Sequence, residues 1–401
     1  MLTIDEARAR LAERAAPLPY AEVSLAAALG LRLAADAQAD VDMPPADVSA
    51  MDGYAARASD LAAGAPLPVA FAVSAGEAAP PLPAGAAARI FTGAMLPAGS
   101  DTVVQQEVAE LRPDGRVVLP ALPVGTNVRP RGEVFVVGAR VAAVGELVTP
   151  GRVGLLAAAG AARLTAIPRP RVAVLLTGNE LVGVGSRPKP GQIRDSNGAM
   201  LAALAAEAGL AVTALDTVGD ELEATSAALA RAAASADLVV TTGGVSVGDR
   251  DLVPAAIGRL GGETVLHRVA MQPGKPILVA RLGDAWLVGL PGNPVSALVG
   301  WRMFVRPLAE ALAGDGAAFA EVPVTAELVA AVRNGGDRTQ LRPAVLHRGG
   351  TGLAVSVRRW HGSHDVVAAA PANALARLEV GADLAAGAPV ACYPLPWRWT
   401  A

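Results

Sequence analysis

The middle of the chain carries a buried-strand pattern, a glycine-rich turn and a helix pattern in direct succession, from Asp237 to Leu260. Leu238 to Val240 is an apolar, β-branched run, which is typical of a buried strand. Gly243, Gly244 and Gly248 supply the turn. A strand that enters a helix through such a turn is typical of α/β sheets, where bare N–H groups and the helix dipole bind anions.

Two aspartates, Asp249 and Asp251, follow these glycines. Carboxylates repel a neighbouring anion unless a divalent cation lies between them. The turn therefore predicts one of two things. It is a phosphate site completed by a cation such as Mg²⁺, or it is an ordinary tight turn with solvated aspartates, since such turns need glycine in any case.

Strand and helix patterns alternate on both sides of this turn. Strands are predicted at 171–176, 210–215 and 237–241, and helices at 196–208, 222–234 and 252–260. This succession predicts a parallel, doubly wound sheet, in which ligands bind beyond the carboxyl ends of the strands. Glu180, Asp220 and the Gly243–Asp251 loop each follow such an end, so we expect one pocket. Glu180 has a second interpretation, a helix-start carboxylate that faces the helix dipole.

Two further turns in this half carry polar groups. Gln272-Pro-Gly-Lys-Pro holds Lys275, which is either an oxyanion contact or an exposed turn lysine. Gly289-Leu-Pro-Gly-Asn-Pro-Val-Ser precedes an apolar helix predicted at 295–312. The N–H groups of this second turn are expected to form another anion-binding nest.

The flanking regions favour short elements. Further helices are predicted at 3–14, 23–29 and 153–161, and short strands at 69–73, 88–91, 102–105, 117–119, 322–324, 353–357 and 389–392. The earlier strands alternate with Pro and Gly and predict a small all-β module, and the later ones predict a C-terminal barrel. The stretch Ile167-Pro-Arg-Pro is predicted to be a linker.

Composition narrows the class of protein. With 401 residues the chain is too long for one core, so we expect about two to four domains. The net charge of −3 and the lack of a long basic run argue against nucleic-acid binding. Cys392 is the only cysteine, which excludes an intramolecular disulfide and fits a reducing compartment. Residues 1–14 lack the apolar core of a signal peptide, and no apolar span reaches the roughly 18 residues of a membrane helix. We therefore expect a soluble, cytoplasmic protein.

Several common site motifs are missing from the sequence. It contains neither the Gly-x-x-x-x-Gly-Lys-Ser/Thr P-loop nor the Gly-x-Gly-x-x-Gly dinucleotide fingerprint. The loops offer no Ser-His-Asp arrangement. His361 and His364 have metal-like spacing, but no Cys or Glu motif joins them, which favours a structural role over zinc.

Seven short motifs nevertheless occur in a characteristic order. They are Ser49-Ala-Met-Asp-Gly-Tyr-Ala, Thr92-Gly-Ala, Arg129-Pro-Arg-Gly-Glu, Thr177-Gly-Asn-Glu-Leu, Thr242-Gly-Gly-Val-Ser-Val-Gly-Asp, Pro273-Gly-Lys-Pro and Leu290-Pro-Gly-Asn-Pro-Val-Ser. Together they resemble the MoeA family, the molybdopterin molybdenumtransferases. The resemblance extends from the N-terminus to about Val390.

This resemblance implies a multidomain α/β plus β protein that forms an L-shaped homodimer. Its domains would be a discontinuous linker and dimerisation domain (1–45 with 139–168), an inserted β module (46–138), a doubly wound molybdopterin-binding α/β domain (169–316) and a C-terminal β barrel (317–401). The site would lie between the α/β domain of one subunit and the β module of the other. Partners would be the small-molecule substrates and possible further proteins of molybdenum cofactor biosynthesis.

The resemblance also implies a reaction, the Mg²⁺-dependent insertion of molybdate into adenylylated molybdopterin with release of AMP. Catalytic positions would be Asp52, Thr92, Glu180, Asp220 and Asp251, and the metal ligands would be Glu180, Asp249 and Asp251. Substrate-binding positions would be Gly243, Gly244, Ser246, Gly248, Lys275, Pro291, Gly292, Asn293, Arg342 and Ser363. Among these, Ser246, Lys275, Arg342 and Ser363 are the candidates for holding molybdate.

Two positions depart from the family pattern. Val134 stands where an aspartate is expected after Arg-Gly-Glu, and Gln272 stands where some members have lysine. The missing carboxylate motivates an alternative, a relative that binds molybdopterin or scaffolds partner enzymes without turnover. A third hypothesis is a pterin or nucleotide hydrolase that shares only the α/β domain, against which the N-terminal motifs argue.

Overall fold

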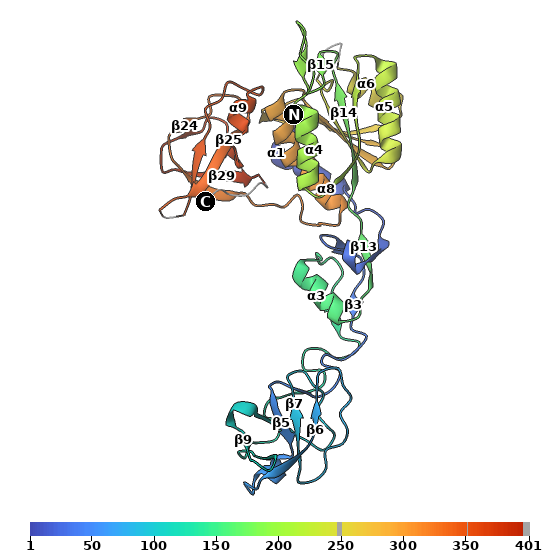
Figure 1. Ribbon diagram of the computed structural model, residues 1–401. Helices are drawn as coiled ribbons and strands as arrows, with labels where there is room; N and C mark the ends of the chain where they lie inside the picture. Colours follow the sequence, from blue (N-terminus) through green and yellow to red (C-terminus); the bar gives the residue numbers. More distant parts are fainter. Residues whose placement is uncertain (247–250, 351, 396–401) are drawn as a thin grey trace. The chain divides into compact units, whose positions relative to one another are not determined.

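The computed structural model describes residues 1–246, 251–350 and 352–395, which form two compact units (Figure 1). One unit combines Met1–Tyr20 with Ile167–Ala401, and the other is Ala21–Ala166. The division into four domains with the boundaries given above stays a prediction.

The first unit is built around a six-stranded sheet. Its order is β17 (Ala211–Val218), β14 (Arg171–Thr177), β18 (Leu238–Thr242), β22 (Ala285–Leu290), β21 (Leu278–Leu282) and β19 (Glu263–His267). The first four strands are parallel, as predicted, but β21 and β19 run antiparallel to their neighbours. The expectation of a wholly parallel sheet is therefore wrong at this edge. Only Gly283 and Asp284 separate β21 from β22, and a two-residue connection can join only antiparallel strands.

Helices cover both faces of the sheet, as in a doubly wound fold. The helices α4 (Asn197–Glu207) and α7 (Pro294–Gly300) share one apolar cluster with α1 (Ile4–Arg14), and α5 (Leu222–Ser235) and α6 (Leu252–Arg259) belong to another. The Thr3 side chain and Glu6 form a reciprocal capping box that starts α1. In Figure 1, α5 and α4 lie on opposite sides of the strands.

The apolar helix predicted at 295–312 forms as one continuous element with a change of pitch. A π-helical turn, Trp301–Val305, joins α7 to α8 (Arg306–Leu312). The turn contains Arg302, whose buried guanidinium pairs with Glu321 and donates to the Pro394 carbonyl. These bonds tie the helix to the C-terminal part of the chain.

That part is a closed five-stranded barrel, as predicted. Its strands are β23 (Val324–Leu328), β25 (Thr339–Arg348), β26 (Leu353–Val357), β27 (Ala374–Leu378) and β29 (Pro389–Pro394). Closure results because β25 pairs with both β26 and β27. The short strand β20 (Met271–Gln272) leaves the α/β sheet region and pairs with β25, and α9 (Val366–Ala369) lies in the β26–β27 connection.

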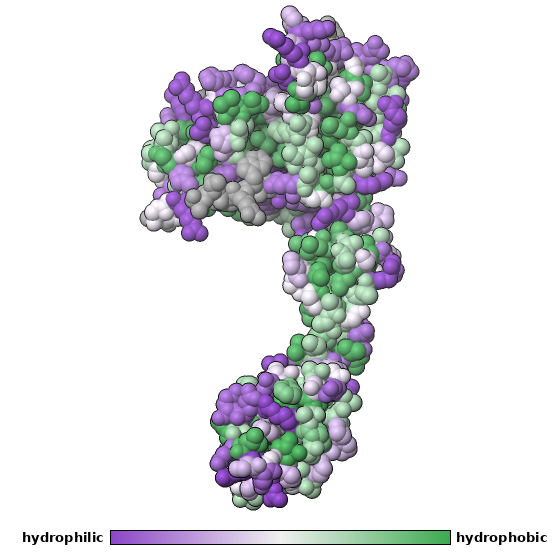
Figure 2. Space-filling view, viewed as in Figure 1, coloured by the Kyte–Doolittle hydropathy of each residue, from purple (hydrophilic) through white to green (hydrophobic). Residues whose placement is uncertain are grey.

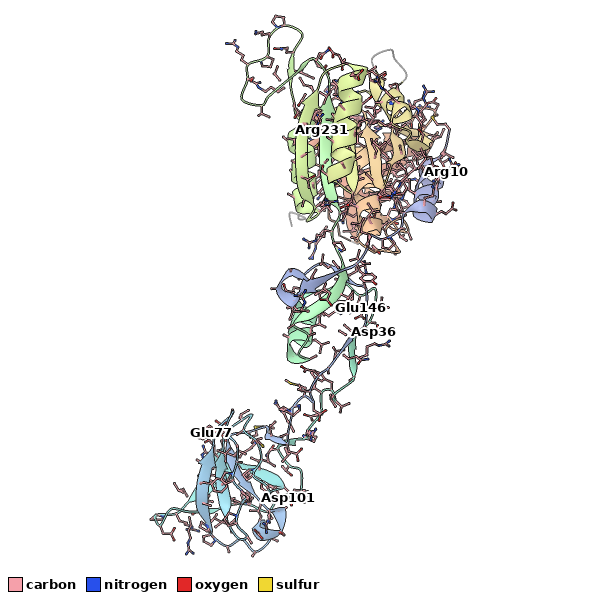
Figure 3. All side chains as sticks on the ribbon, turned by 90° about the vertical axis from the view of Figure 1, so that its right-hand side faces the viewer. Arg10, Asp36, Glu77, Asp101, Glu146 and Arg231 are labelled. Carbon is pink, nitrogen blue, oxygen red and sulfur yellow. The ribbon has the colours of Figure 1, made fainter. Side chains whose placement is uncertain are left out.

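The second unit begins with a small sheet of β1 (Ala21–Ser24), β13 (Arg163–Ile167) and β2 (Arg32–Leu33) beside α3 (Pro150–Ala158). The short helix predicted at 23–29 is wrong, because residues 21–24 pair as a strand with β13 and only Leu25–Ala27 form a 3₁₀ turn. The partner strand lies far away in the sequence, so local propensity could not reveal it. Asp36 and Glu146 (Figure 3) hold the turn at residues 143–144 through its N–H groups.

The rest of the second unit is the predicted all-β module. Its sheet has the order β8 (Thr102–Gln105), β5 (Gly53–Ala56), β7 (Ala87–Ile90), β6 (Leu67–Val73), β10 (Arg116–Val118) and β9 (Glu110–Leu111). Gly53 is required where β5 meets β8, because a Cβ there would overlap the Val104 carbonyl.

Short elements complete the two units. They are the strand pairs β3 (Ala37–Gln38) with β12 (Arg140–Ala142), β4 (Val48–Ser49) with β11 (Val128–Arg129), β15 (Leu181–Val182) with β16 (Ile193–Arg194) and β24 (Val332–Arg333) with β28 (Asp383–Leu384), the helix α2 (Ala58–Leu61) and the 3₁₀ turn Gln106–Val108. Among the described residues, none of the helices is long and apolar enough to cross a membrane.

Candidate functional site

The carboxyl ends of the parallel strands border a cavity of about 670 Å³. We call it the acidic cavity because Glu180, Asp195, Asp220 and Asp251 are part of its wall. Glu180 follows β14, Asp220 follows β17 and Asp251 precedes α6. The strand order thus brings together the three carboxylates that the sequence placed at strand ends. Asp249 and Gly248 lie outside the described residues.

Asp195 is a fourth carboxylate that the sequence interpretation missed. Its Oδ1 accepts a hydrogen bond of 2.8 Å from the Gly198 N–H in the first turn of α4. An aspartate three residues before such an N–H is a recognisable helix-start signal. A signal of this kind predicts a cap but does not predict that the cap borders a cavity.

Gly243 and Gly244 form the floor of the acidic cavity in a left-handed conformation, with φ of 88° and 64°. A Cβ on Gly243 would lie 2.7 Å from the Thr177 carbonyl oxygen, so only glycine fits. The Gly243 N–H, however, donates to the Leu290 carbonyl at 3.0 Å. The prediction of bare N–H groups is therefore wrong at Gly243, because parallel pairing of β18 with β22 continues one residue past the strand.

A buried amide, Asn197, lies beside this floor and was also missed. Its Nδ2 donates to Thr242 Oγ1 at 2.8 Å and to the Gly292 carbonyl at 2.7 Å. Its Oδ1 is buried and has no hydrogen-bond partner among the described residues. A buried acceptor without a partner is costly, so Asn197 is held here by the two bonds that its Nδ2 donates.

A second cavity, of about 380 Å³, adjoins the first. We call it the basic cavity because Lys275 and Arg338 are part of its wall. Asn293 and His364 border both cavities, and the Asn293 Nδ2 donates to Ser363 Oγ at 2.8 Å. The turn 272–276 and the loop 360–364 meet here, so the wall comes from the α/β sheet region and from the barrel.

Some of the predicted substrate-binding residues border these two cavities, and others do not. Lys275, Pro291 and Ser363 border the basic cavity, Gly292 borders the acidic cavity, and Asn293 borders both. Ser246 is exposed and borders neither. Arg342 does not border the basic cavity; Arg338, four residues earlier, does. Burial lowers the pKa of Arg342, whose Nε donates to Gln340 Oε1 at 2.9 Å.

The loop that carries Ser363 and His364 is held by Asp365. This carboxylate accepts from the His361 and Ala368 N–H groups and contacts His361 Nδ1 at 3.0 Å. The His361 N–H is the largest cause that lowers the pKa of Asp365 to about 2. His361 therefore supports a helix start in this structure, while His364 faces the cavities.

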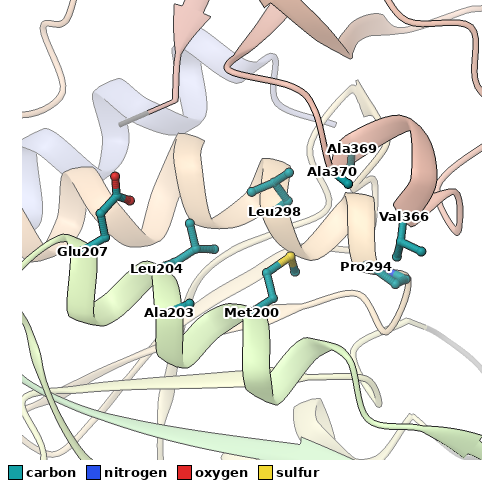
Figure 4. A pocket seen from close by; sticks show the side chains of 9 residues that line it. All are labelled: Met200, Ala203, Leu204, Glu207, Pro294, Leu298, Val366, Ala369 and Ala370. Carbon is teal, nitrogen blue, oxygen red and sulfur yellow. The ribbon is translucent and has the colours of Figure 1, made fainter. Parts of the chain in front are cut away.

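An apolar cavity of about 410 Å³ lies next to the acidic cavity, between α4, α7 and α9 (Figure 4). Pro294 and Val366 border both cavities. Glu207 is the one ionisable group in this wall, and desolvation raises its pKa. The remaining lining side chains are aliphatic apart from the thioether of Met200.

In the second unit, Asp52 and Thr92 form a pair. Asp52 Oδ1 accepts from the Thr92 N–H and from Thr92 Oγ1, both at 2.8 Å, and these bonds lower the pKa of Asp52. The two predicted residues of the β module are thus brought together from different loops. Val134 is 66% exposed and, with Met43 and other apolar residues, borders a cavity of about 730 Å³.

The carboxylates of the acidic cavity are oxygen donors of the kind that Mg²⁺ prefers. Within residues 1–246, 251–350 and 352–395, no group of three or more His, Cys, Asp or Glu side chains gathers closely enough to hold a metal ion by itself. Mg²⁺ is commonly held by one or two carboxylates together with substrate phosphates, so a closed protein cage is not required. The donors of the acidic cavity therefore fit Mg²⁺ in combination with a phosphorylated ligand.

Comparisons with known proteins agree with this arrangement. Residues 2–160 match the MoeA N-terminal region (domain I and II), residues 173–311 a probable molybdopterin binding domain, and residues 325–395 the MoeA C-terminal region (domain IV). The chain is 41% identical over 318 residues to molybdopterin molybdenumtransferase 2 of Mycobacterium tuberculosis, covering 77% of this chain and 78% of that protein. It is 32% identical over 386 residues to the molybdopterin molybdenumtransferase of Staphylococcus aureus, covering 95% and 92%.

A solved structure of a molybdopterin biosynthesis MoeA protein from Pyrococcus horikosii superimposes with a TM-score of 0.83 at 31% identity, and each chain is covered completely. The fold, the order of the three matched regions and the identity over most of the chain all lead to the same assignment. The chain belongs to the MoeA family, whose curated members are named molybdopterin molybdenumtransferases.

Proposed function

We propose that this chain is a molybdopterin molybdenumtransferase that inserts molybdate into adenylylated molybdopterin, with Mg²⁺ bound and AMP released. Membership of the family makes it an enzyme of molybdenum cofactor biosynthesis. The observation that carries the finer proposal is the pair of adjoining cavities of opposite charge, which share Asn293 and His364. A phosphoanhydride with its cation suits one of them, and a free oxyanion suits the other.

The basic cavity provides both charge and neutral donors for molybdate. Lys275 and Arg338 supply cationic donors, which bind oxyanions more strongly than neutral ones. Because Ser363 Oγ accepts from Asn293, its own hydrogen is available to donate to a ligand. The cavity therefore offers donors of both kinds around a space of about 380 Å³.

The acidic cavity suits the adenylylated substrate. Glu180, Asp220 and Asp251 are the residues that would hold Mg²⁺ against the phosphoanhydride. The ion, when bound, neutralises charge on the phosphoanhydride as its bond to AMP breaks. The glycine floor leaves room for a ligand close to the backbone.

We further propose that the protein acts as a homodimer in which Asp52 and Thr92 of one subunit complete the site of the other. Exposed apolar residues in the second unit support a covered surface there: Leu29 (50%), Val144 (61%) and Leu147 (40%) lie on segments that hydrogen-bond to each other. Figure 2 shows hydrophobic residues (green) gathered on the part of this unit that contains α3. Mixing two inactive variants tests this arrangement. If Asp52→Asn and Glu180→Gln inactivate opposite halves of a shared site, random mixed dimers should regain about a quarter of full activity.

The reaction itself is tested by incubating the protein with adenylylated molybdopterin, Mg²⁺ and molybdate, and measuring AMP and active cofactor together. The proposal requires both products in equal amounts. AMP without cofactor would indicate a hydrolase. Retention of the ligand without either product would indicate a binding or scaffold protein, the candidate that the exposed apolar Val134 favours.

A further inference from the structure

Three polar side chains form a hydrogen-bonded chain that leads from the barrel to the basic cavity. Arg342 Nε donates to Gln340 Oε1 at 2.9 Å, and Gln340 Nε2 donates to Gln272 Oε1 at 3.2 Å. Gln272 borders the basic cavity, whereas Arg342 and Gln340 do not. A cation that lies outside the cavity is thus connected to its wall through two amides.

Strand register builds this chain. Gln340 and Arg342 are two residues apart on β25, so their side chains lie on the same face of the strand. The parallel pairing of β20 with β25 places Gln272 opposite Gln340. Gly336 packs against the two amides, because a Cβ there would lie 3.2 Å from Gln272 Oε1 and 3.5 Å from Gln340 Nε2.

The chain has a direction that its chemistry fixes. A guanidinium can only donate, so Gln340 must present its oxygen to Arg342 and its NH₂ group to Gln272. Gln272 must then present its oxygen to Gln340, which leaves its own NH₂ group for the cavity. Gln340 is only 6% exposed, so the reversed amide would leave mismatched polar atoms in a buried place. Gln272 Nε2 has no protein partner among the described residues.

We propose that Gln272 donates a neutral hydrogen bond to the oxyanion in the basic cavity, and that Arg342 is a positioning residue that fixes this donor through Gln340. The inference rests on the proposed function, since that function puts molybdate in this cavity. It assigns a role to a glutamine that stands where some relatives have lysine. It also gives a role to the half-buried Arg342, which does not border the cavity itself.

A double-mutant cycle tests whether Arg342 acts on the ligand through Gln340 and Gln272. Gln272→Ala, Arg342→Met and the double variant are compared with the unchanged protein for the molybdate KM, for kcat and for the affinity for adenylylated molybdopterin. Each single variant should raise the molybdate KM by about three- to tenfold, the value of one neutral hydrogen bond. The other two quantities should stay within about twofold. The double variant should be no worse than Gln272→Ala, because Arg342 acts only through Gln272.

Three further variants remove the simpler explanations. Arg342→Lys keeps a donor and should restore most of the affinity, which lost packing alone would not predict. Arg348→Met removes an exposed arginine from the same strand and should change nothing. Gln272→Glu replaces the NH₂ group by an oxygen in a side chain of equal size, so the molybdate KM should rise more than tenfold. This last variant changes a side chain at the end of the short strand β20 and tests the donor even if Arg342→Met fails to fold.

Two results would overturn the proposal. One is a molybdate KM that Arg342→Met raises equally with and without Gln272, because this would make Arg342 a direct ligand. The other is unchanged molybdate binding in Gln272→Ala and Gln272→Glu. Equilibrium dialysis with molybdate alone reads these affinities without turnover. If the unchanged protein forms no cofactor, the proposed function is wrong. If dialysis gives the same molybdate affinity for the unchanged protein and all the variants, the proposed role of Gln272 and Arg342 is wrong.

Discussion

The acidic and basic cavities share a wall, yet the fold builds them in different ways. Carboxylates of the acidic cavity stand on short loops after β14 and β17 and before α6, at one edge of one sheet. In the basic cavity, Lys275 comes from a turn of the α/β sheet region, and Arg338 comes from the loop between β24 and β25. Sheet topology alone assembles the first, whereas the second exists only because the barrel packs against the sheet region.

This difference has a chemical consequence. The acidic groups approach one another along parallel strands, which suits a shared cation. The basic side chains come from two different regions of the chain, and an anion bound between them can contact both. Asn293 and His364 border both cavities, so a single ligand can extend from the cation side to the oxyanion side.

Removing one carboxylate should give the largest loss of activity. It should affect AMP release and leave molybdate binding intact, which would show that the two cavities have different functions. Asp251→Asn should lower Mg²⁺-dependent AMP release by about 100-fold, the scale of losing a charged contact to the transition state, while molybdate binding stays unchanged. Single-turnover AMP release and equilibrium dialysis measure the two quantities. Asp216→Asn, an exposed aspartate on β17, is the control. Unaffected AMP release in Asp251→Asn would show that this carboxylate does not hold the metal.

Removing the lysine should affect the other cavity. Lys275→Met should raise the molybdate KM by about 10- to 100-fold, because a charge-assisted hydrogen bond is lost, and should leave the affinity for adenylylated molybdopterin unchanged. Lys189→Met removes an exposed lysine and serves as the matched control. Equal losses of affinity for both substrates would contradict the division between the cavities.

The shared wall should respond on both sides, but less. Asn293→Ala removes the 2.8 Å bond to Ser363 Oγ and a polar group from both cavities. About three- to tenfold increases in the KM of each substrate are expected, since one neutral hydrogen bond is lost. Ser363→Ala should reproduce only the molybdate effect. Steady-state kinetics with each substrate varied in turn distinguishes the two variants, and an effect of Asn293→Ala confined to one substrate would argue against a continuous site.

The smallest effect concerns the loop that borders both cavities. The folded-state pKa of Asp365, about 2, lies below the ordinary value of 3.8. A lowered carboxyl pKa contributes stability that is full above the ordinary pKa and is lost as the pH falls through the folded pKa. Asp365→Asn should therefore be less stable than the unchanged protein by a constant amount from pH 5 upward. The gap should close between about pH 4 and pH 2 in urea unfolding series; a gap that does not depend on pH would exclude ionisation as its cause.

Much of the acidic cavity followed from the sequence because its causes are local. A β-branched run followed by glycines marks a strand end, and parallel strands place such ends together. The glycines at 243 and 244 were assigned to a turn, and both adopt the left-handed conformation that requires them. The same local logic failed for residues 23–29, where pairing with β13 determines the structure.

The basic cavity was only partly predictable. Lys275 was found because prolines and a glycine frame it, but Arg338 was missed, and Arg342 was chosen for the same role. Both arginines belong to one barrel segment, and only the register of β20 against β25 decides which of them reaches the cavity. Asn197 was missed because a polar residue at a helix start normally caps the helix.

The sequence by itself determined the family, the α/β region with its strand-end carboxylates, the β module and the barrel. It could do so because periodicity, turn residues and ordered motifs act over a few neighbouring residues. The tertiary structure alone decided that the Gly243 N–H donates to the Leu290 carbonyl, and that Arg342 is connected to the cavity through Gln340 and Gln272. The Gly243–Leu290 bond joins residues 47 positions apart and the Gln340–Gln272 bond joins residues 68 positions apart, and no local pattern encodes such pairings.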